Sequence, residues 1–261
     1  MFTSPTEYNA CMVAANETPY AGRELELFAL ASNWKRYVKA EIGKYLAGNI
    51  LEIGAGLGGT TLALHDGTAR RWVCLEPDAN QAKRLRAAVT ERWGYCAPGV
   101  IAGSLRALAD RPLFDCVLYL DVLEHIQDDR RQIEAAARLV RPGGHIVVLS
   151  PAHQWLFSNF DKSIGHLRRY DKQNLRPLMP SGWIEKKLAY LDSVGVLLSL
   201  ANVLALRQAL PSRLQLLAWD RFCVPLSRIV DRVLLGKFGK SILAVWENRD
   251  NSQDPMVKHA Q

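Results

Sequence analysis

The sequence predicts an α/β fold built on a doubly wound, Rossmann-like sheet with a helical insert near the C-terminus. Strand-like apolar runs alternate with helical patterns, and alternation of this kind produces right-handed βαβ units. A glycine-rich segment lies between the first predicted strand and the next helix, as in nucleotide-binding sheets. The 261 residues are 49% hydrophobic and 23% charged, which allows a sizeable core and excludes disorder, collagen and coiled coil.

The elements alternate regularly along the chain. Residues 23–46 place apolar and aromatic side chains at spacings of three and four, which predicts an amphipathic helix that Gly48 ends. The strands are expected at 50–53, 72–75, 100–102, 116–119, 145–149, 183–190 and 242–247, with helices at 60–65, 80–92 and 130–140. We expect a parallel sheet whose carboxyl edge binds the ligand.

The expected organisation has five parts: an N-terminal arm at 1–22, a core at 23–192, a helical insert at 193–240, the last core strand at 241–249 and a flexible tail at 250–261. The insert contains an apolar stretch bounded by Asp192 and Arg207, which is too short to span a bilayer core of ~30 Å as a helix. We expect the insert to cover the acceptor site. Contact with another subunit and peripheral contact with a membrane are the alternatives.

The charge and the cysteine content of the chain indicate its cellular location and the kinds of molecule that it binds. Five widely spaced cysteines without a CxxC pair disfavour a disulfide framework, and with no recognisable secretory leader they predict a cytoplasmic protein. The net charge of +7 is uneven, because residues 131–261 carry nineteen Lys and Arg against ten Asp and Glu. No separate basic recognition module is present, so we expect a small-molecule acceptor and no binding of duplex nucleic acid. No apolar run is long enough to predict a transmembrane segment.

The glycine loop LEIGAGLGG at 51–59 is the most informative segment. Its glycines satisfy GxGxxG, so an NAD(P)-dependent oxidoreductase or a non-catalytic nucleotide-binding module must be considered. Glu76, at the end of the second predicted strand, would hydrogen-bond a ribose in either case. Glu52 stands two residues before the first glycine, where a carboxylate suits a cationic ligand better than a pyrophosphate. This position favours a sulfonium cofactor with an ammonium group.

Four segments in combination carry a family resemblance: LEIGAGLGG at 51–59, LEPD at 75–78, DVLEHI at 121–126 and LVRPGGHIVV at 139–148. Together they resemble the class I S-adenosylmethionine-dependent methyltransferases, in particular the small-molecule type 11/12 group. The resemblance covers about residues 25 to 190. It implies a seven-stranded methyltransferase sheet, S-adenosylmethionine as cofactor, S-adenosylhomocysteine as product and methyl transfer to a small acceptor.

The resemblance also implies which residues bind the cofactor. The methionine part would contact Glu52, the backbone of Gly54, Ala55, Gly56 and Gly58, and Leu120 and Asp121. The nucleoside would contact Glu76, Pro77 and Asp78, with Ser104 and Leu105 near the adenine, although many family members carry an Asp where this chain has Ser104. Trp34 lies in a helix resembling the one that covers the cofactor, where helix packing and a cation–π contact with the sulfonium are both open.

The acceptor side is expected at the same rim of the sheet. A hydroxyl acceptor needs a general base, and the residues expected there are His125, His153, His166 and Tyr170. Arg168 and Arg169 are expected to bind the acceptor, because guanidinium groups suit carboxylate or phosphate. The sequence therefore predicts a small, anionic and partly hydrophobic acceptor, with O-methylation favoured.

A metal-assisted mechanism is the alternative. Asp121, Glu124 and His125 with the distal His166 resemble the pattern by which small-RNA 3′-end methyltransferases and certain ubiquinone-pathway O-methyltransferases bind a divalent ion. Such an ion would lower the pKa of a bound hydroxyl. Many type 11 members share DxLEH without a metal, so we favour the metal-free mechanism.

Overall fold

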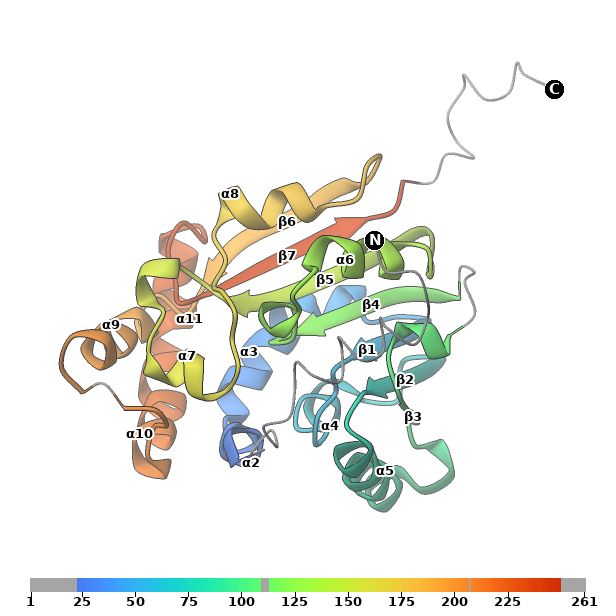
Figure 1. The fold of residues 1–261 in the computed structure, drawn as a ribbon, viewed down its shortest axis with the longest axis horizontal. Coiled ribbons are helices and arrows are strands. Elements are labelled where there is room, and N and C mark those ends of the chain that lie inside the picture. The colour runs from blue at the N-terminus through green and yellow to red at the C-terminus, as the bar shows by residue number, and fades with distance from the viewer. Residues whose placement is uncertain (1–22, 109–112, 207, 250–261) are drawn as a thin grey trace, which may run out of the picture.

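A seven-stranded mixed sheet forms the centre of the molecule (Figure 1). The computed structural model describes residues 23–108, 113–206 and 208–249, so the expected N-terminal arm and tail lie outside the described residues. The strands are β1 (Asn49–Ile53), β2 (Arg71–Glu76), β3 (Gly99–Ala102), β4 (Phe114–Leu120), β5 (Val140–Pro151), β6 (Ile184–Leu191) and β7 (Ser241–Glu247). Their order in the sheet is β3-β2-β1-β4-β5-β7-β6.

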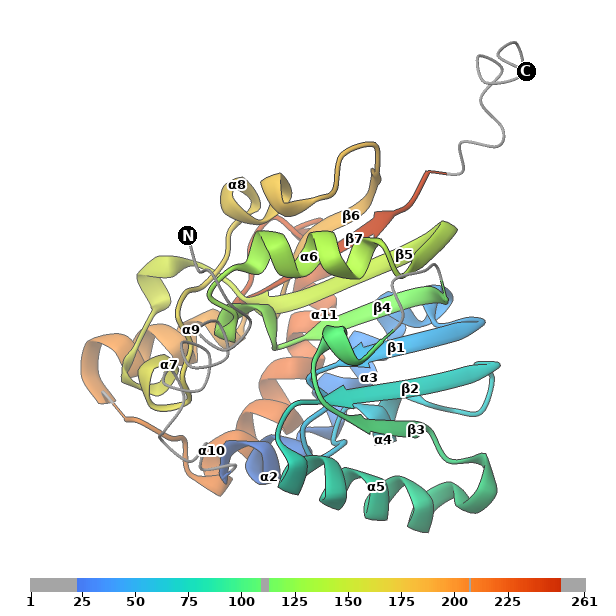
Figure 2. The same cartoon turned by 45° about the vertical axis from the view of Figure 1, so that its right-hand side comes forward.

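Helices cover both faces of the sheet and gather at one end (Figure 2). The α-helices are α2 (Arg23–Ala29), α3 (Ser32–Ile42), α4 (Thr61–Leu64), α5 (Ala79–Trp93), α6 (Asp129–Ala137), α7 (Asn159–Ser163), α8 (Lys172–Leu175), α9 (Gly195–Ala201), α10 (Arg213–Ala218) and α11 (Val224–Val233). Short 3-10 turns are η1 (Gly43–Tyr45), η2 (Gly94–Cys96), η3 (Leu105–Ala107), η4 (Leu123–His125), η5 (Gln154–Leu156) and η6 (Arg176–Leu178), and π-helical turns are η7 (Asn202–Leu206) and η8 (Trp219–Cys223). The predicted α/β fold with a C-terminal helical insert is confirmed.

Alternate residues of the strands build two cores. Successive side chains of a strand point to opposite faces of the sheet. In β1, Ile50 packs with Leu85 of α5 and the helices on one face, whereas Leu51 packs with Ile133 of α6 on the other. Both faces are therefore buried, which explains why the strands of this region are nearly continuous apolar runs.

The direction of β7 places the insert beside the ligand edge. Strands β1 to β5 pair in parallel, but β7 is antiparallel to both β5 and β6, which differs from the expected parallel sheet. Because β6 ends and β7 begins at the same edge, the chain between them leaves and re-enters the sheet at the carboxyl edge of the parallel strands. Figure 1 accordingly shows α9 and α10 grouped with α7 and α2 at that edge.

The single helix expected at 23–46 is divided into α2 and α3. The break falls at Leu30 and Ala31, and the amides of Asn33 and Trp34 at the start of α3 donate to the Asp220 carboxylate at 3.1 and 2.9 Å. A carboxylate at this position stabilises a helix N-terminus. Asp220 comes from the insert, so the break could not be read from local periodicity. None of the described helices is long and apolar enough to cross a membrane.

Candidate active site

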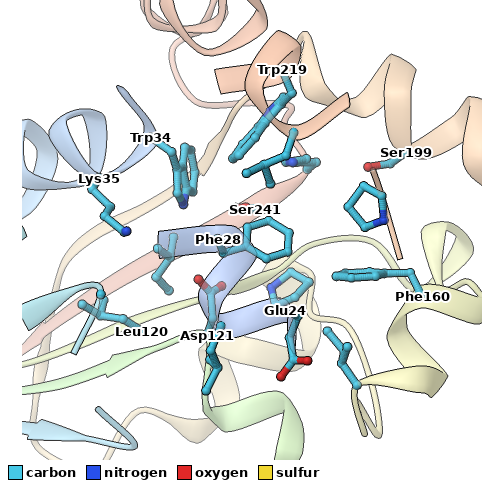
Figure 3. A pocket seen from close by; sticks show the side chains of 18 of the residues that line it. Glu24, Phe28, Trp34, Lys35, Leu120, Asp121, Phe160, Ser199, Trp219 and Ser241 are labelled. Carbon is cyan, nitrogen blue, oxygen red and sulfur yellow. The ribbon is translucent and has the colours of Figure 1, made fainter. Parts of the chain in front are cut away.

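A cavity of about 590 Å³ lies where the carboxyl edge of the sheet meets α2, α3 and the insert. Apolar and aromatic side chains, including Phe28, Trp34, Phe160 and Trp219, form much of its wall. In Figure 3 the carboxylate of Asp121 and the ammonium group of Lys35 point into this space. A cavity of this size and character is typical of a site for a small organic ligand.

The glycine loop forms one end of the cavity, where Gly54, Ala55 and Gly56 line the wall. Gly54 has φ of +64°, and a Cβ atom there would lie 2.7 Å from the side chain of Val122. Gly58 has φ of +82° and does not line the wall, because it packs beneath the loop where a Cβ atom would lie 2.4 Å from Leu85. Side chains at these two positions would therefore prevent the loop conformation in which the backbone of Gly54 lines the cavity.

Glu52 is buried between the glycine loop and β2. Its Oε2 accepts hydrogen bonds from the Thr61 hydroxyl at 2.8 Å and the Trp72 indole at 2.9 Å, and Glu52 also contributes to the cavity wall. Burial raises the pKa of Glu52 to about 7, although these hydrogen bonds act in the opposite direction. A cation entering the cavity would favour the ionised carboxylate.

The expected nucleoside residues lie beside the glycine loop but outside the cavity wall. Glu76 ties the loop to β2, because its Oε2 accepts from the Gly56 amide at 2.8 Å and its Oε1 from the Asp78 amide at 2.9 Å. Burial raises the pKa of Glu76. The adjacent Pro77 and Ser104 are exposed at the ends of two paired strands, and half-buried Leu105 follows. These residues therefore lie together at the ends of β2 and β3, next to the glycine loop.

Asp121 and Leu120 end β4 and line the cavity. Asp121 has φ of +57°, in the left-handed region, and its amide donates to the Leu149 carbonyl at 2.8 Å. Surrounding protein raises the pKa of Asp121 to about 6, while the charges of His166 and Lys240 act in the opposite direction. This carboxylate therefore lies among groups that can stabilise its charge.

A buried cluster around His166 forms another part of the cavity wall. The imidazole Nδ1 lies 2.9 Å from Asp161 Oδ1, and Nε2 lies 3.7 Å from Glu124 Oε1. Arg169 donates to both oxygens of Asp161, at 2.8 and 2.9 Å, and also lines the wall. The carboxylate of Asp161 thus fixes both the ring of His166 and the guanidinium of Arg169.

Four other residues expected on the acceptor side do not line this cavity. The ring of His125 lies 4.6 Å from that of His166 and burial lowers its pKa to about 4, while His153 stacks on Tyr190 at 4.6 Å. Tyr170 donates to Asp129 at 2.7 Å, and burial together with that carboxylate raises its pKa. Arg168 donates to the same Asp129 at 2.7 Å.

The structure adds two cations that the sequence did not single out. Lys35 of α3 lines the cavity, donates to the Ala29 carbonyl at 2.7 Å, and has its pKa lowered by burial to about 8. Lys240 lies 3.4 Å from Asp192 and 3.8 Å from the ring centroid of Trp219, and burial lowers its pKa. Lys35 lies in the segment that was expected to cover the cofactor, so the sequence contains some indication of it. No sequence motif near Lys240 indicates a role in the site.

Comparison with known proteins identifies the domain that carries this site. Residues 51–148 match the family model described as a methyltransferase domain. They form a class I S-adenosylmethionine-dependent methyltransferase domain of the type 11 group. The family predicted from the sequence is confirmed, and the methyltransferase domain runs from β1 to β5 with the glycine loop near its start.

Two curated relatives and one solved structure are similar to this methyltransferase domain. A ubiquinone biosynthesis O-methyltransferase of Alkalilimnicola ehrlichii is 35% identical over 116 residues, which are 42% of this chain and 44% of that protein. A norajmaline N-methyltransferase of Rauvolfia serpentina is 28% identical over 135 residues, which are 50% of this chain and 44% of that protein. The chain thus spans less than half the length of these relatives. The N-methyltransferase NodS of Bradyrhizobium japonicum WM9, solved with S-adenosyl-L-homocysteine, shares the fold with a TM-score of 0.53 and 17% identity, covering 90% of this chain and 93% of that one.

Proposed function

We propose that this protein transfers a methyl group from S-adenosylmethionine to a small, anionic and partly hydrophobic acceptor, with O-methylation as the favoured chemistry. The observation that carries the proposal is one continuous cavity that joins the glycine loop to the buried cluster around His166. The names of similar proteins include both an O-methyltransferase and an N-methyltransferase, and both support methyl transfer as the class of reaction.

The glycine loop and its neighbours fit the cofactor. The backbone of Gly54, which lines the cavity with φ of +64°, and the carboxylate of Glu52, whose pKa burial raises, suit a ligand that carries an ammonium group. We assign Glu76 to the ribose, and Pro77 and Ser104 to the adenine, because they lie next to the glycine loop at the ends of two paired strands. When bound, S-adenosylmethionine supplies an electrophilic methyl carbon, so the protein mainly positions the acceptor.

The other end of the cavity fits a hydroxyl acceptor with an anionic group. His166 is our choice of general base, because it lines the cavity and Asp161 engages Nδ1, while the nearest carboxylate oxygen to Nε2, on Glu124, is 3.7 Å away. His166 accepts the acceptor proton while the acceptor oxygen takes the methyl group. We assign the anionic group to Lys240 and Arg169, which both line the cavity, and the hydrophobic part to contacts with Phe160 and Trp219.

Labelled cofactor tests this proposal. The purified protein is incubated with a metabolite extract and S-adenosylmethionine carrying an isotopically labelled methyl group, and the products are analysed by mass spectrometry. We expect a small-molecule product heavier by one labelled methyl group, which the His166→Gln variant forms at least about a hundredfold more slowly, since a general base typically contributes 10²- to 10⁴-fold. Labelling of a nucleic acid and of no small molecule would contradict the proposal.

A divalent-metal-assisted O-methyltransferase is the second candidate. Glu124, His125 and His166 offer ligand atoms that all lie within 4.8 Å of one another, and Glu124 Oε1 has no hydrogen-bond partner among the described residues. Asp121, expected as a fourth ligand, is not part of this group. A metal held by the three residues would act as a Lewis acid toward the acceptor oxygen. Loss of turnover in the presence of a chelator, restored by a divalent metal, would favour this candidate.

A further inference from the structure

The insert carries an unusual number of apolar side chains that no other described part of the molecule covers. Among the described residues, eighteen large hydrophobic side chains are exposed, and twelve of them lie between residues 197 and 238. Leu214, Phe222, Val233 and Leu235 are each 68% exposed or more. Scattered exposed hydrophobics are normal, but this concentration in one segment is not. We call these twelve side chains the insert face.

Helix α11 shows that the insert face is an ordered stripe. Leu226, Ile229 and Val233 are 49%, 62% and 78% exposed, and with Phe222 they follow the spacing of four, three and four that places residues on one side of a helix. The buried residues Val224, Ser227 and Asp231 lie on the other side. The helix is thus apolar on its outer side, where a helix of a water-soluble monomer carries polar residues.

Buried aspartates fix the insert to the core. Asp231 accepts hydrogen bonds from the Tyr37 hydroxyl at 2.8 Å and the Asp192 amide at 2.6 Å, and Asp192 in turn accepts from the Trp219 indole at 2.7 Å. Asp220 caps α3. The outer stripe is therefore held in a fixed orientation.

The charges around the insert face have one sign. Asp220 and Asp231 are the two acidic residues of segment 193–240, and both are buried. The exposed charges are Arg213, Arg221, Arg232 and Lys237, none of which makes an ion pair within the described part of the chain. An apolar stripe flanked by unpaired cations is the pattern of helices that lie in the headgroup region of anionic bilayers.

We propose that the insert face binds the surface of an anionic lipid bilayer, with α11 lying in the interface. The cations complement the lipid headgroups and the apolar side chains enter the acyl boundary. A symmetric contact between two copies would instead bring the same cations together. No described helix is long enough to cross a membrane, which agrees with binding at the surface.

The position of the cavity extends this inference to the acceptor. Leu198 and Phe222 belong both to the insert face and to the cavity wall. The cavity therefore borders the surface that would meet the lipid. Figure 2 shows α9 and α10 on the same side of the molecule as α7. Resting on the proposed function, this geometry makes the acceptor a membrane-borne amphiphile with an anionic head.

Vesicle cosedimentation of the full chain tests the membrane surface without any methyl-transfer step. We expect binding to vesicles of phosphatidylcholine mixed with phosphatidylglycerol, little binding to pure phosphatidylcholine, and weakening with added salt. Ile229→Asp with Val233→Asp should lower the partition coefficient at least tenfold. Arg221→Gln with Arg232→Gln should lower it about fivefold for each cation removed.

Matched controls use exposed residues far from the insert. Arg92→Gln, in the last turn of α5, and Tyr95→Asp, in the following turn η2, should bind vesicles as the wild type does. Calorimetry with S-adenosylhomocysteine reports whether each variant keeps a folded cofactor site, so failure of the membrane proposal is separate from failure of the proposed function. Equal binding by wild type and both double variants, or absence of vesicle binding by the wild type, would overturn the proposal. A dimer in light scattering that Ile229→Asp with Val233→Asp dissociates would assign the insert face to a second copy.

Discussion

Replacing Glu52 by Gln removes one negative charge from the cofactor end of the cavity and keeps the side-chain shape. The amide oxygen of Gln can still accept from Thr61 and Trp72, which now donate to Glu52 Oε2. Under the proposed function, what is lost is the charge-assisted contact with the ammonium group of the cofactor. A hydrogen bond of this kind contributes about 1.5–3 kcal/mol. Its loss should therefore raise the dissociation constant of S-adenosylhomocysteine by about 10- to 150-fold.

The same substitution should remove a pH dependence. Burial raises the pKa of Glu52 to about 7, so this carboxyl is largely protonated below that pH. Because the ammonium group binds the ionised form, a proton must leave on binding, and affinity should fall about tenfold per pH unit below the pKa. Above it, affinity should be constant. The Glu52→Gln variant should show no such slope.

Titration calorimetry with S-adenosylhomocysteine on either side of pH 7 measures both effects. Glu91→Gln, an exposed residue of α5, is the matched control and should bind as the wild type does at each pH. Equal affinities of the wild type and Glu52→Gln, or the same pH slope in both, would refute the role that we assign to Glu52.

Four further outcomes are expected. Gly58→Ala should lower the free energy of unfolding in urea by about 1–2 kcal/mol or more, because φ is +82° there and Leu85 is in the way; unchanged stability would contradict the reading of the loop. Asp220→Ala should lower that free energy by about 1–3 kcal/mol, since the start of α3 loses its cap, and an unchanged melting temperature would show that the cap is dispensable. His166→Gln should slow turnover while the dissociation constant of S-adenosylhomocysteine stays within a factor of about three; an equal loss in both would make His166 a structural residue. Chelation of divalent metals should leave the turnover of the wild type unchanged, and a loss would support the metal-assisted candidate.

Much of the methyltransferase core could be predicted because its signals are local. The glycine loop, the strand pattern and the carboxylates at positions 52 and 76 each depend on residues close in sequence, and the structure places the strands within a few residues of the expected ranges. The break between α2 and α3 is different, because its cause is a carboxylate that comes from the insert, far along the chain. The spacing of apolar residues within 23–46 does not depend on that contact, so it could not predict the break.

The acceptor end could be predicted only in part, for the same reason. His166 and Arg169 line the cavity as the order of strands suggested, but Arg168 turns to Asp129 and His153 stacks on Tyr190. Which of several neighbouring polar residues faces a cavity depends on long-range pairing. Lys240 enters the site because β7 runs antiparallel beside β5, a direction that strand patterns alone do not specify.

Binding of S-adenosylhomocysteine and of NADH, compared by calorimetry on the wild-type protein, tests the central claim most directly. The central claim is that the glycine loop with Glu52 holds a sulfonium cofactor, and not a dinucleotide. We predict a saturable heat of binding with one S-adenosylhomocysteine per chain and none with NADH, whose pyrophosphate would meet the carboxylate of Glu52. Tight binding of NADH with no binding of S-adenosylhomocysteine would contradict the account.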